Sequence, residues 1–567
     1  MSAASVAEIT RELTSAGALF ELDEREIGGR RVRYWKNFPR TLDEVVRFAL
    51  RHGDKTYVVY EDERLNYAQT FERVAALSAH LTEFGVQRGD RVAIAMRNFP
   101  EWVIAFWAAS LTGAVVVPLN AWWKGGELSY GLSDSGARVL FCDAERAQLL
   151  AAYLEETEVR QVIVVRAPLN TPLPSPQLRF EEVWLRHQGA ALPEVGISPD
   201  DDATIFYTSG TTGKPKGALG THLNICSNIG STLYARYRTA MRSGEDFTQL
   251  VVQALARQPA FLLSVPLFHV TGCHSGLTMN TYMGAKIVMM HKWLPERALE
   301  LIEREQITHF GGVPSMVWQV LESPDFTRRD LSSVVAVTYG GAPAAPELVR
   351  RIKQSFPKSS ASNGYGLTET SALTCSNAGV DYERKPDSVG VPVALCDVKV
   401  IDADGTTLPL GEVGELCIRG ANVVRGYFRK PEATALSFRD GWLHTGDVAR
   451  VDEEGFVYIL DRAKDMLIRG GENIYCVEVE DVLYSHPAVM DAAVIGIAHR
   501  VLGEEVGAIV QLAPSSTATA EELREYAAER LAGFKVPVRI EVRTEPLPRN
   551  PNGKIMKREL KRELGWE

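Results

Sequence analysis

The sequence has few cysteines, and their spacing indicates neither a disulfide framework nor a zinc site. Only seven occur in 567 residues, and no two of them form a CxxC pair. Disulfide-stapled domains and structural zinc sites both depend on paired or closely spaced cysteines. We therefore expect reduced thiols and a cytoplasmic protein.

The chain also lacks an excess of basic residues. Its 62 lysines and arginines are outnumbered by 72 aspartates and glutamates, which gives a net charge of −10. Proteins that bind nucleic acid or an anionic membrane surface without specificity usually carry the opposite balance. The charge therefore predicts no nucleic-acid partner.

No integral membrane segment is predicted. The first eight residues have neither a basic start nor an apolar core, so they do not form a signal peptide. The uncharged run 102–119 is long enough to span a membrane, but Gly113 interrupts it and residues 115–118 are typical of a strand. We interpret this run as a buried helix, a glycine stop and a buried strand.

The length of the chain exceeds what one hydrophobic core usually holds, so we expect at least two domains. Between residues 41 and 165, helical patterns alternate with short apolar strands, which indicates parallel sheets covered by helices. Short strands and tight turns follow over 389–459 and predict a small β-subdomain. Residues 1–40 are expected to lie on the main body as an extension.

One stretch is typical of a phosphate-binding loop. Residues 207–217 read Tyr-Thr-Ser-Gly-Thr-Thr-Gly-Lys-Pro-Lys-Gly, after an apolar strand and before a helix for which Thr221 is the expected N-cap. Glycines let the backbone approach a phosphate, hydroxyl and N–H groups donate hydrogen bonds, and lysines supply charge. A flexible linker rarely carries two lysines and a proline among its glycines.

The loop is not a Walker A motif, because Thr208 and Pro215 occupy positions that need Gly and Ser or Thr. It resembles the signature of the adenylate-forming (ANL) superfamily, which includes acyl-CoA synthetases, peptide-synthetase adenylation domains and beetle luciferases. Segments 363–369, 442–447, 461–474 and 546–555 resemble further motifs of that family, in the family's order. The resemblance covers most of the chain, from about residue 40 to about residue 560.

The resemblance implies an α/β fold with two domains. We expect a large N-terminal adenylation domain over 1–463, made of parallel-sheet α/β subdomains and a β-subdomain, and a small mobile α+β C-terminal domain over 464–567. Lys464 occupies the family's hinge position, so the C-terminal domain would rotate about it. A hinge residue absorbs a large change in φ and ψ.

The resemblance also implies an ATP site. Asn363 and Tyr365 would hold the adenine, Thr368 would contact the α-phosphate, and Asp447 would accept hydrogen bonds from both ribose hydroxyls. Glu369 would bind Mg²⁺, since a carboxylate oxygen is a hard ligand that suits this ion. The residues expected to contact ATP or CoA are Thr208, Ser209, Gly210, Thr211, Thr212, Gly213, Lys214, Lys216, Gly341, Ala342, Pro343, Asn363, Gly364, Tyr365, Asp447, Arg462, Lys464, Gly471, Phe534 and Lys535.

Lys554 matches the family's catalytic lysine, although a lysine beside other basic residues is usually part of a solvated face. Thr368, Glu369 and His269 complete the expected catalytic set. His269 stands beside the expected acyl pocket, where amino-acid-activating domains usually have an aspartate, so a free α-amino substrate is not expected. Gly471 would line a tunnel for CoA. Phe534 and Lys535 match a family segment near the CoA nucleotide, but a helix that ends at a glycine would account for the same residues.

The expected activity is that of an acid–thiol ligase. The enzyme would adenylate a small-molecule carboxylic acid with ATP and Mg²⁺, then transfer the acyl group to coenzyme A. We favour a fatty, aromatic or other bulky hydrophobic acid. The alternatives are an enzyme that loads a carrier protein or another acceptor, and a non-catalytic nucleotide-binding protein on the same fold. A homodimer is possible, but no sequence feature indicates one.

Overall fold

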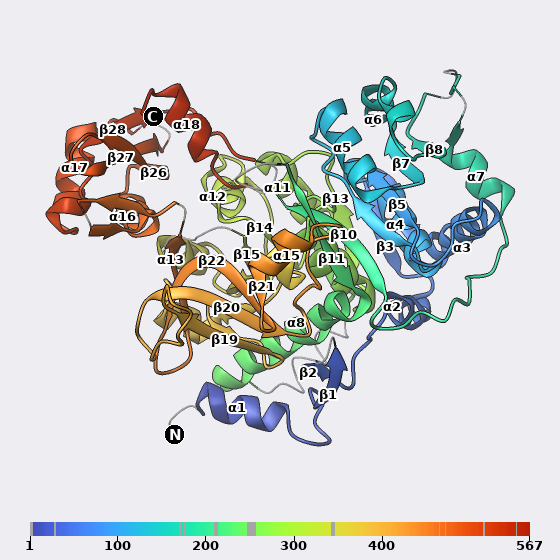
Figure 1. The fold of residues 1–567 in the computed structure, drawn as a ribbon, viewed down its shortest axis with the longest axis horizontal. Helices are drawn as coiled ribbons and strands as arrows, with labels where there is room; N and C mark the ends of the chain where they lie inside the picture. Colours follow the sequence, from blue (N-terminus) through green and yellow to red (C-terminus); the bar gives the residue numbers. More distant parts are fainter. Residues whose placement is uncertain are drawn as a thin grey trace.

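The computed structural model describes most of the chain (Figure 1). The described residues are 4–27, 30–168, 170, 172–174, 176–208, 214–245, 257–341, 346–463, 465–470, 472–513, 516–550 and 553–566, without the side chain of residue 30.

A seven-stranded sheet forms the first layer, in the order β11-β10-β6-β5-β7-β8-β9. Its strands are parallel except for the antiparallel pair β10–β11. The strands are β5 (Arg91–Ala95), β6 (Val115–Pro118), β7 (Val139–Asp143), β8 (Gln161–Val165), β9 (Gln177–Arg179), β10 (Asp202–Thr208) and β11 (Lys216–Thr221). The helices of this part are α3 (Tyr67–Glu83), α4 (Pro100–Leu111), α5 (Gly125–Ser135), α6 (Ala144–Leu150) and α7 (Phe180–Arg186).

The uncharged run is internal. Every residue of α4 is buried, the chain turns at Gly113 with φ +76°, and β6 is buried along its length. A helix that is apolar on all sides is stable between two layers of protein. No helix among the described residues has the length and apolar character needed to cross a membrane.

A nine-stranded sheet forms the second layer, in the order β18-β17-β16-β15-β14-β12-β13-β3-β4. The strands are β3 (Thr56–Tyr60), β4 (Glu63–Asn66), β12 (Ala260–Leu263), β13 (Lys286–Met289), β14 (His309–Gly312), β15 (Ala336–Gly340), β16 (Ser360–Tyr365), β17 (Cys375–Ala378) and β18 (Val391–Pro392). One core packs against α11 (Pro295–Arg304), α12 (Pro314–Glu322) and α13 (Pro346–Ser355). The other includes α4, α2 (Leu42–Ala49) and α8 (His222–Arg242). The shorter helical segments nearby are a π-helix over Thr271–Thr278, α10 (Met279–Tyr282) and α14 (Gly379–Arg384).

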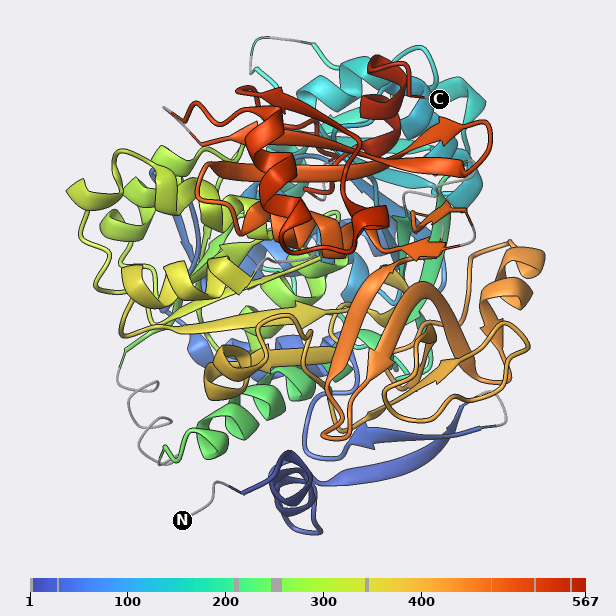
Figure 2. The same cartoon turned by 90° about the vertical axis from the view of Figure 1, so that its left-hand side faces the viewer.

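Two smaller sheets follow. The β-subdomain is antiparallel, as expected, and contains β19 (Cys396–Ile401), β20 (Gly414–Gly420), β21 (Phe438–Arg439), β22 (Trp442–Val451), β23 (Val457–Arg462) and helix α15 (Pro431–Ser437). The C-terminal sheet contains β24 (Leu467–Arg469), β25 (Glu472–Ile474), β26 (Val489–His499), β27 (Gly503–Leu512) and β28 (Arg539–Arg543), with α16 (Cys476–Tyr484), α17 (Ala520–Ala528) and α18 (Lys557–Glu563). This unit lies against the large domain on the side of α12 and α13 (Figure 2).

The N-terminal extension lies on the main body, as predicted. It consists of α1 (Val6–Leu13) and the hairpin β1 (Leu22–Ile27) and β2 (Arg30–Trp35). Trp35 and Phe20 pack against Tyr234 of α8, and the Trp35 indole N–H donates to Ser231 Oγ at 3.1 Å. The extension therefore braces the long helix that follows the phosphate loop.

Candidate active site

The phosphate loop closes a β-hairpin. Thr208 pairs with Lys216 across β10 and β11, and its hydroxyl donates to the Lys216 carbonyl at 3.3 Å. The expected direct passage from loop to helix is wrong, because β11 lies between them. Thr221 is the N-cap of α8, as expected, and accepts from the Asn224 N–H at 3.2 Å. Phosphate binding here would depend on the loop's own donors and lysines. The predicted residues Ser209, Gly210, Thr211, Thr212 and Gly213 lie outside the described part of the chain.

The two lysines of the loop lie over tyrosine rings. Lys214 Nζ is 5.0 Å from the centre of the Tyr130 ring, and Lys216 Nζ is 4.3 Å from that of Tyr427. The Tyr427 hydroxyl donates to Glu369 Oε1 at 2.7 Å. The hairpin therefore brings a cation close to the predicted metal ligand.

The motif over 363–369 ends β16 and continues into a short 3₁₀ turn, Thr368–Thr370. Gly366 is required by packing, since a Cβ there would lie 1.3 Å from the Ala372 carbonyl oxygen. Glu369 is half-buried, with one oxygen held by Tyr427. A half-buried carboxylate that keeps an oxygen for a ligand fits a Mg²⁺ site, and the Mg²⁺ role of Glu369 stays a prediction.

Tyr365, Asp447 and Arg462 form one network. The Tyr365 hydroxyl donates to Asp447 Oδ2 at 2.5 Å, and Arg462 Nε lies 2.7 Å from Asp447 Oδ1. Asp447 is 2% exposed and faces Arg462 across β22 and β23. Burial, and next the Asp447 charge, raise the pKa of Tyr365, so its hydroxyl keeps its proton. Two residues predicted to bind the nucleotide, Tyr365 and Arg462, therefore hold the carboxylate of a third, Asp447.

The sequence analysis gave no role to Glu415 or Thr445, which support the turn before Asp447. Glu415 Oε1 accepts from the Gly446 N–H at 3.0 Å, and its other oxygen lies 3.2 Å from His444 Nδ1. Thr445 donates to the Leu416 carbonyl at 2.7 Å. These bonds fix the turn that presents Asp447. These bonds form because β20 pairs with β22, and no motif in the sequence indicates that pairing.

Gly340 and Gly341, at the end of β15, differ in what surrounds them. A Cβ at Gly340 would lie 2.3 Å from the Gly364 carbonyl oxygen, so strand pairing alone requires this glycine. Gly341 has φ +77°, and no atom of the described residues lies within 4 Å of its Cβ position. Of these two glycines, Gly341 is therefore the one beside open space. Ala342 and Pro343 lie outside the described residues. Asn363 is buried and pairs in register with Tyr339.

His269 and Lys554 come together from the two domains. Burial, with the Lys554 charge as a smaller cause, lowers the pKa of His269 to about 3, so the ring is neutral. The turn that carries Lys554 packs on the large domain, where a Cβ at Gly553 would lie 2.5 Å from Val313 Cγ2. Lys554 itself is exposed and precedes α18, as expected.

The remaining predicted residues concern the hinge and CoA. Lys464 and Gly471 lie outside the described residues. Lys535 Nζ bonds Glu478 at 2.7 Å, and it lies 5.7 Å from the centre of the Phe534 ring. In this arrangement the Lys535 charge is already paired, and a CoA role for either residue stays a prediction.

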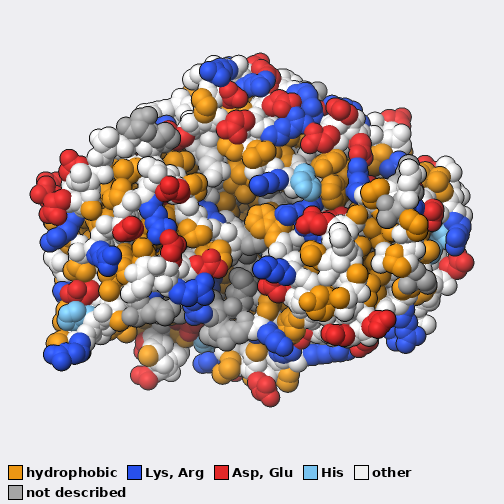
Figure 3. Space-filling view, turned by 90° about the horizontal axis from the view of Figure 1, so that it is seen from above, with side chains coloured by type: hydrophobic (Ala, Val, Ile, Leu, Met, Phe, Trp, Pro, Cys, Tyr) orange, Lys and Arg blue, Asp and Glu red, His pale blue; other side chains and the backbone are white. Residues whose placement is uncertain are grey.

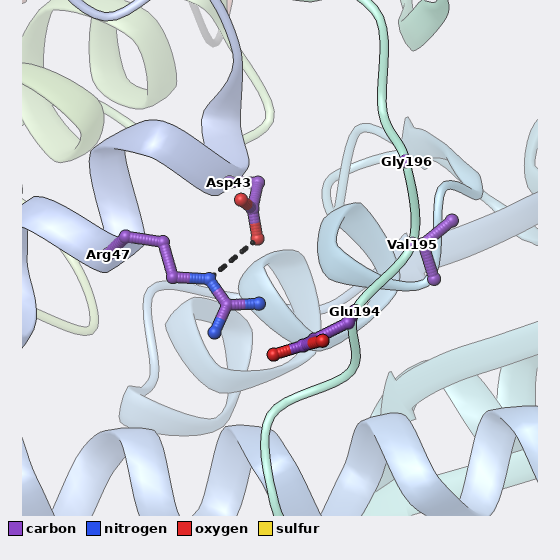
Figure 4. Close-up of a pocket in the computed structure, with 5 residues that line it drawn as sticks. All are labelled: Asp43, Arg47, Glu194, Val195 and Gly196. Carbon is purple, nitrogen blue, oxygen red and sulfur yellow. Dashed lines mark hydrogen bonds and ion pairs between the residues drawn. The ribbon is translucent and has the colours of Figure 1, made fainter.

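A separate surface pocket lies between α2 and the connection before β10 (Figure 4). Arg47 Nε donates to Asp43 Oδ1 at 3.1 Å inside it. None of its lining residues belongs to the nucleotide motifs. On the face drawn in Figure 3, acidic and basic side chains are interspersed and form no continuous basic stripe.

Comparison with known proteins identifies the family. The family model described as "AMP-binding enzyme" matches residues 45–428, and the model "AMP-binding enzyme C-terminal domain" matches 478–554. A feruloyl-CoA synthase from Amycolatopsis sp is 36% identical over 91% of this chain and 96% of its own. A long-chain-fatty-acid–CoA ligase from Bacillus subtilis (strain 168) is 34% identical over 92% and 94%.

Solved structures of similar fold support the same family. The anthranilate CoA ligase AuaEII, in complex with anthranoyl-AMP, has a TM-score of 0.80 and 27% identity over 92% of this chain and 96% of its own. The amide bond synthetase McbA from Marinactinospora thermotolerans has a TM-score of 0.78 and 27% identity over 92% and 99%. The chain therefore belongs to the AMP-binding enzymes of the adenylate-forming superfamily and is an ATP-dependent, AMP-forming acyl-CoA ligase.

Proposed function

We propose that the protein activates a small carboxylic acid in two half-reactions catalysed at one site in two domain arrangements. The observation that supports this proposal is the packing of the turn that carries Lys554 on the large domain at Val313, where the Lys554 charge contributes to lowering the pKa of His269. Residues of the C-terminal unit would thus complete a nucleotide site in the large domain.

In the first half-reaction the carboxylate attacks the α-phosphorus of ATP, which gives acyl-AMP and pyrophosphate. A carboxylate is already a nucleophile at neutral pH, so no general base is needed. Two anions must meet, and alignment with charge cancellation therefore lowers the barrier. Lys554 would contact both the carboxylate and the α-phosphate, while Lys214 and Lys216 would contact the departing pyrophosphate.

The ribose would bind at Asp447, whose carboxylate Tyr365 and Arg462 hold in place. Glu369 would ligate Mg²⁺, which supplies charge neutralisation at the phosphates when bound. His269, being neutral, would act as a wall of the acyl site rather than as an acid or base.

In the second half-reaction the CoA thiol replaces AMP on the acyl carbon. The C-terminal domain would turn about Lys464, so that Lys554 leaves and Gly471 lines the entrance for CoA. Closure would protect the acyl-AMP from water.

Two variants test the two arrangements. Lys554→Ala is expected to lower acyl-AMP formation at least about 100-fold, because it removes a charge that acts only on the reacting groups, and to spare thioester formation from supplied acyl-AMP. Gly471→Leu is expected to do the reverse. Arg558→Ala, four residues from Lys554 and also exposed, is the control. Equal losses in both half-reactions for both variants would contradict the two arrangements.

A further inference from the structure

The turn that carries Lys554 is closed by local hydrogen bonds. The Asn550 N–H donates to the Lys554 carbonyl at 2.9 Å, and the Gly553 N–H donates to the Asn550 carbonyl at 2.8 Å. The Lys554 N–H donates to the side-chain oxygen of Asn550 at 3.0 Å. These bonds fix the shape of the turn, but they do not fix where the turn lies on the C-terminal unit.

A charge pair anchors the turn on its N-terminal side. Arg549 pairs with Asp491 of β26 through one terminal nitrogen of its guanidinium, and it donates through the other to the Gly553 carbonyl. Asp491 is 6% exposed and also accepts the Tyr484 hydroxyl at 2.5 Å. One planar guanidinium therefore links a buried carboxylate to the peptide group directly before Lys554.

A second charge pair anchors the turn on its C-terminal side. Lys557 is the first residue of α18, and its Nζ lies 2.7 Å from Glu480 Oε1. Glu480 is 8% exposed, and the same oxygen accepts the Val494 N–H at 2.8 Å. A buried charge that loses its partner is costly, so each pair resists separation. Lys554 therefore stands between two anchors along the chain.

Both anchors depend on one helix. Glu480 and Tyr484 are four residues apart on α16, and side chains with this spacing lie on the same face of a helix. Glu480 pairs with Lys557 directly, and Tyr484 holds the carboxylate that binds Arg549. One face of α16 therefore supports both ends of the turn.

We propose that the two buried carboxylates, Asp491 and Glu480, are positioning residues for adenylation. Through Arg549 and Lys557 they hold Lys554 where it meets the reacting groups. The inference rests on the proposed function, since it assigns what orients the predicted catalytic lysine. A lysine side chain is a long flexible stem, so it aligns its charge reproducibly only when its backbone is held. A displacement of about 1 Å in such a group can cost about 100-fold in rate.

The two half-reactions separate a positioning role from a structural one. Adenylation is measured as ATP–pyrophosphate exchange with octanoate and with cinnamate, and thiol transfer as thioester formation from octanoyl-AMP or cinnamoyl-AMP and CoA. Asp491→Asn and Arg549→Gln are each expected to lower adenylation roughly 10- to 100-fold and to spare thiol transfer, because Lys554 acts only in the first step. Arg549→Lys keeps the charge but cannot make both bonds at once, so an intermediate loss is expected.

Combination with Lys554→Ala sharpens the test. In that background Asp491→Asn is expected to lower the residual adenylation less than about twofold, because no lysine is left to orient. Arg530→Gln, at an exposed arginine that pairs with Glu529 in the same unit, is the matched control and is expected to change neither half-reaction. Equal losses in both half-reactions, or a full additional loss in the Lys554→Ala background, would overturn the inference.

A measurement without substrate distinguishes failure of this inference from failure of the proposed function. Trypsin cleaves after Lys554, and the rate of that cut in the folded protein is followed by mass spectrometry. Arg549→Gln is expected to raise the rate at least about tenfold over wild type and Arg530→Gln, because the turn loses an anchor. If Lys554→Ala leaves adenylation unchanged, the proposed role of Lys554 fails, while a faster cut still supports the anchors. An unchanged cut would overturn the inference, also when neither acid is activated.

Discussion

At the scale of single residues, the site depends on carboxylates held by several donors. Asp447 is buried and receives the Tyr365 hydroxyl and the Arg462 guanidinium, and Glu415 holds the adjoining turn through Gly446. A buried charge is tolerated when it is paired and hydrogen-bonded on all sides. Such a carboxylate is already oriented before a ribose arrives, so binding would cost little reorganisation.

Asp447→Asn keeps the size of this side chain and removes its charge. The KM for ATP is expected to rise roughly 10- to 100-fold, because a hydrogen bond to a charged group contributes about 1.5–3 kcal/mol. Initial rates of pyrophosphate release against ATP concentration give the value. The control is Asp440→Asn, at an exposed turn with φ 49° that asparagine tolerates. An unchanged KM for ATP in Asp447→Asn would remove Asp447 from the nucleotide site.

At the scale of elements, the N-terminal extension and α8 behave as one unit. Trp35 is 2% exposed and packs so closely on Gly230 that a Cβ there would lie 2.4 Å from Trp35 Cδ1. The same helix begins directly after the phosphate hairpin. Bracing α8 therefore supports the hairpin that holds the phosphate loop.

Trp35→Ala is expected to lower the free energy of unfolding by about 3–5 kcal/mol, as for other buried tryptophans replaced by alanine. Chemical denaturation followed by circular dichroism measures the change. Trp122→Ala, at a tryptophan that is 46% exposed, is expected to cost much less. Equal effects of the two substitutions would show that the extension does not stabilise the large domain.

At the scale of the whole molecule, buried neutral histidines make the large domain sensitive to acid. Burial is the largest cause that lowers their pKa values, to about 4 for His222 and His274 and about 3 for His269 and His309. Unfolded histidines titrate near pH 6.5, so the unfolded chain binds protons first. The stability that these groups contribute is complete above about pH 6.5 and is lost as the pH falls toward 3–4.

The Tm of the protein is therefore expected to fall between pH 7 and pH 5. Each histidine contributes up to about 2 kcal/mol over this interval. Asp461 and Asp481, whose pKa values burial raises to about 6 and about 8, oppose the trend but are fewer. His274→Gln is expected to reduce the dependence on pH. A Tm that is constant or rises toward pH 5 would contradict this account.

The sequence predicted the elements that local composition or a short motif is enough to identify. The run 102–119 identified α4 and β6 by its lack of charge. The Thr-Gly-Asp and Asn-Gly-Lys segments indicated Asp447 and Lys554 by resemblance, and the roles of these two residues stay predictions. Strand β11 was missed because Lys216–Thr221 contains glycines and no run of β-branched residues.

Contacts between distant elements could not be predicted. The bond from the Gly446 amide to Glu415 depends on the register of β20 and β22. In the sequence Arg238 and Arg242 are alike, and only the tertiary structure shows that Arg238 bonds the Ser376 carbonyl whereas Arg242 pairs with Asp381.

The most direct test of the central claim is pyrophosphate release from ATP across a panel of carboxylic acids, with and without CoA. We predict release with at least one acid, a sharp increase when CoA is added, and formation of the acyl-CoA thioester in equal amount. Release that ignores CoA and yields no thioester would contradict transfer to this thiol and indicate a carrier protein or an amine as acceptor. No release with any acid, from a folded protein that binds ATP, would contradict the adenylation step itself.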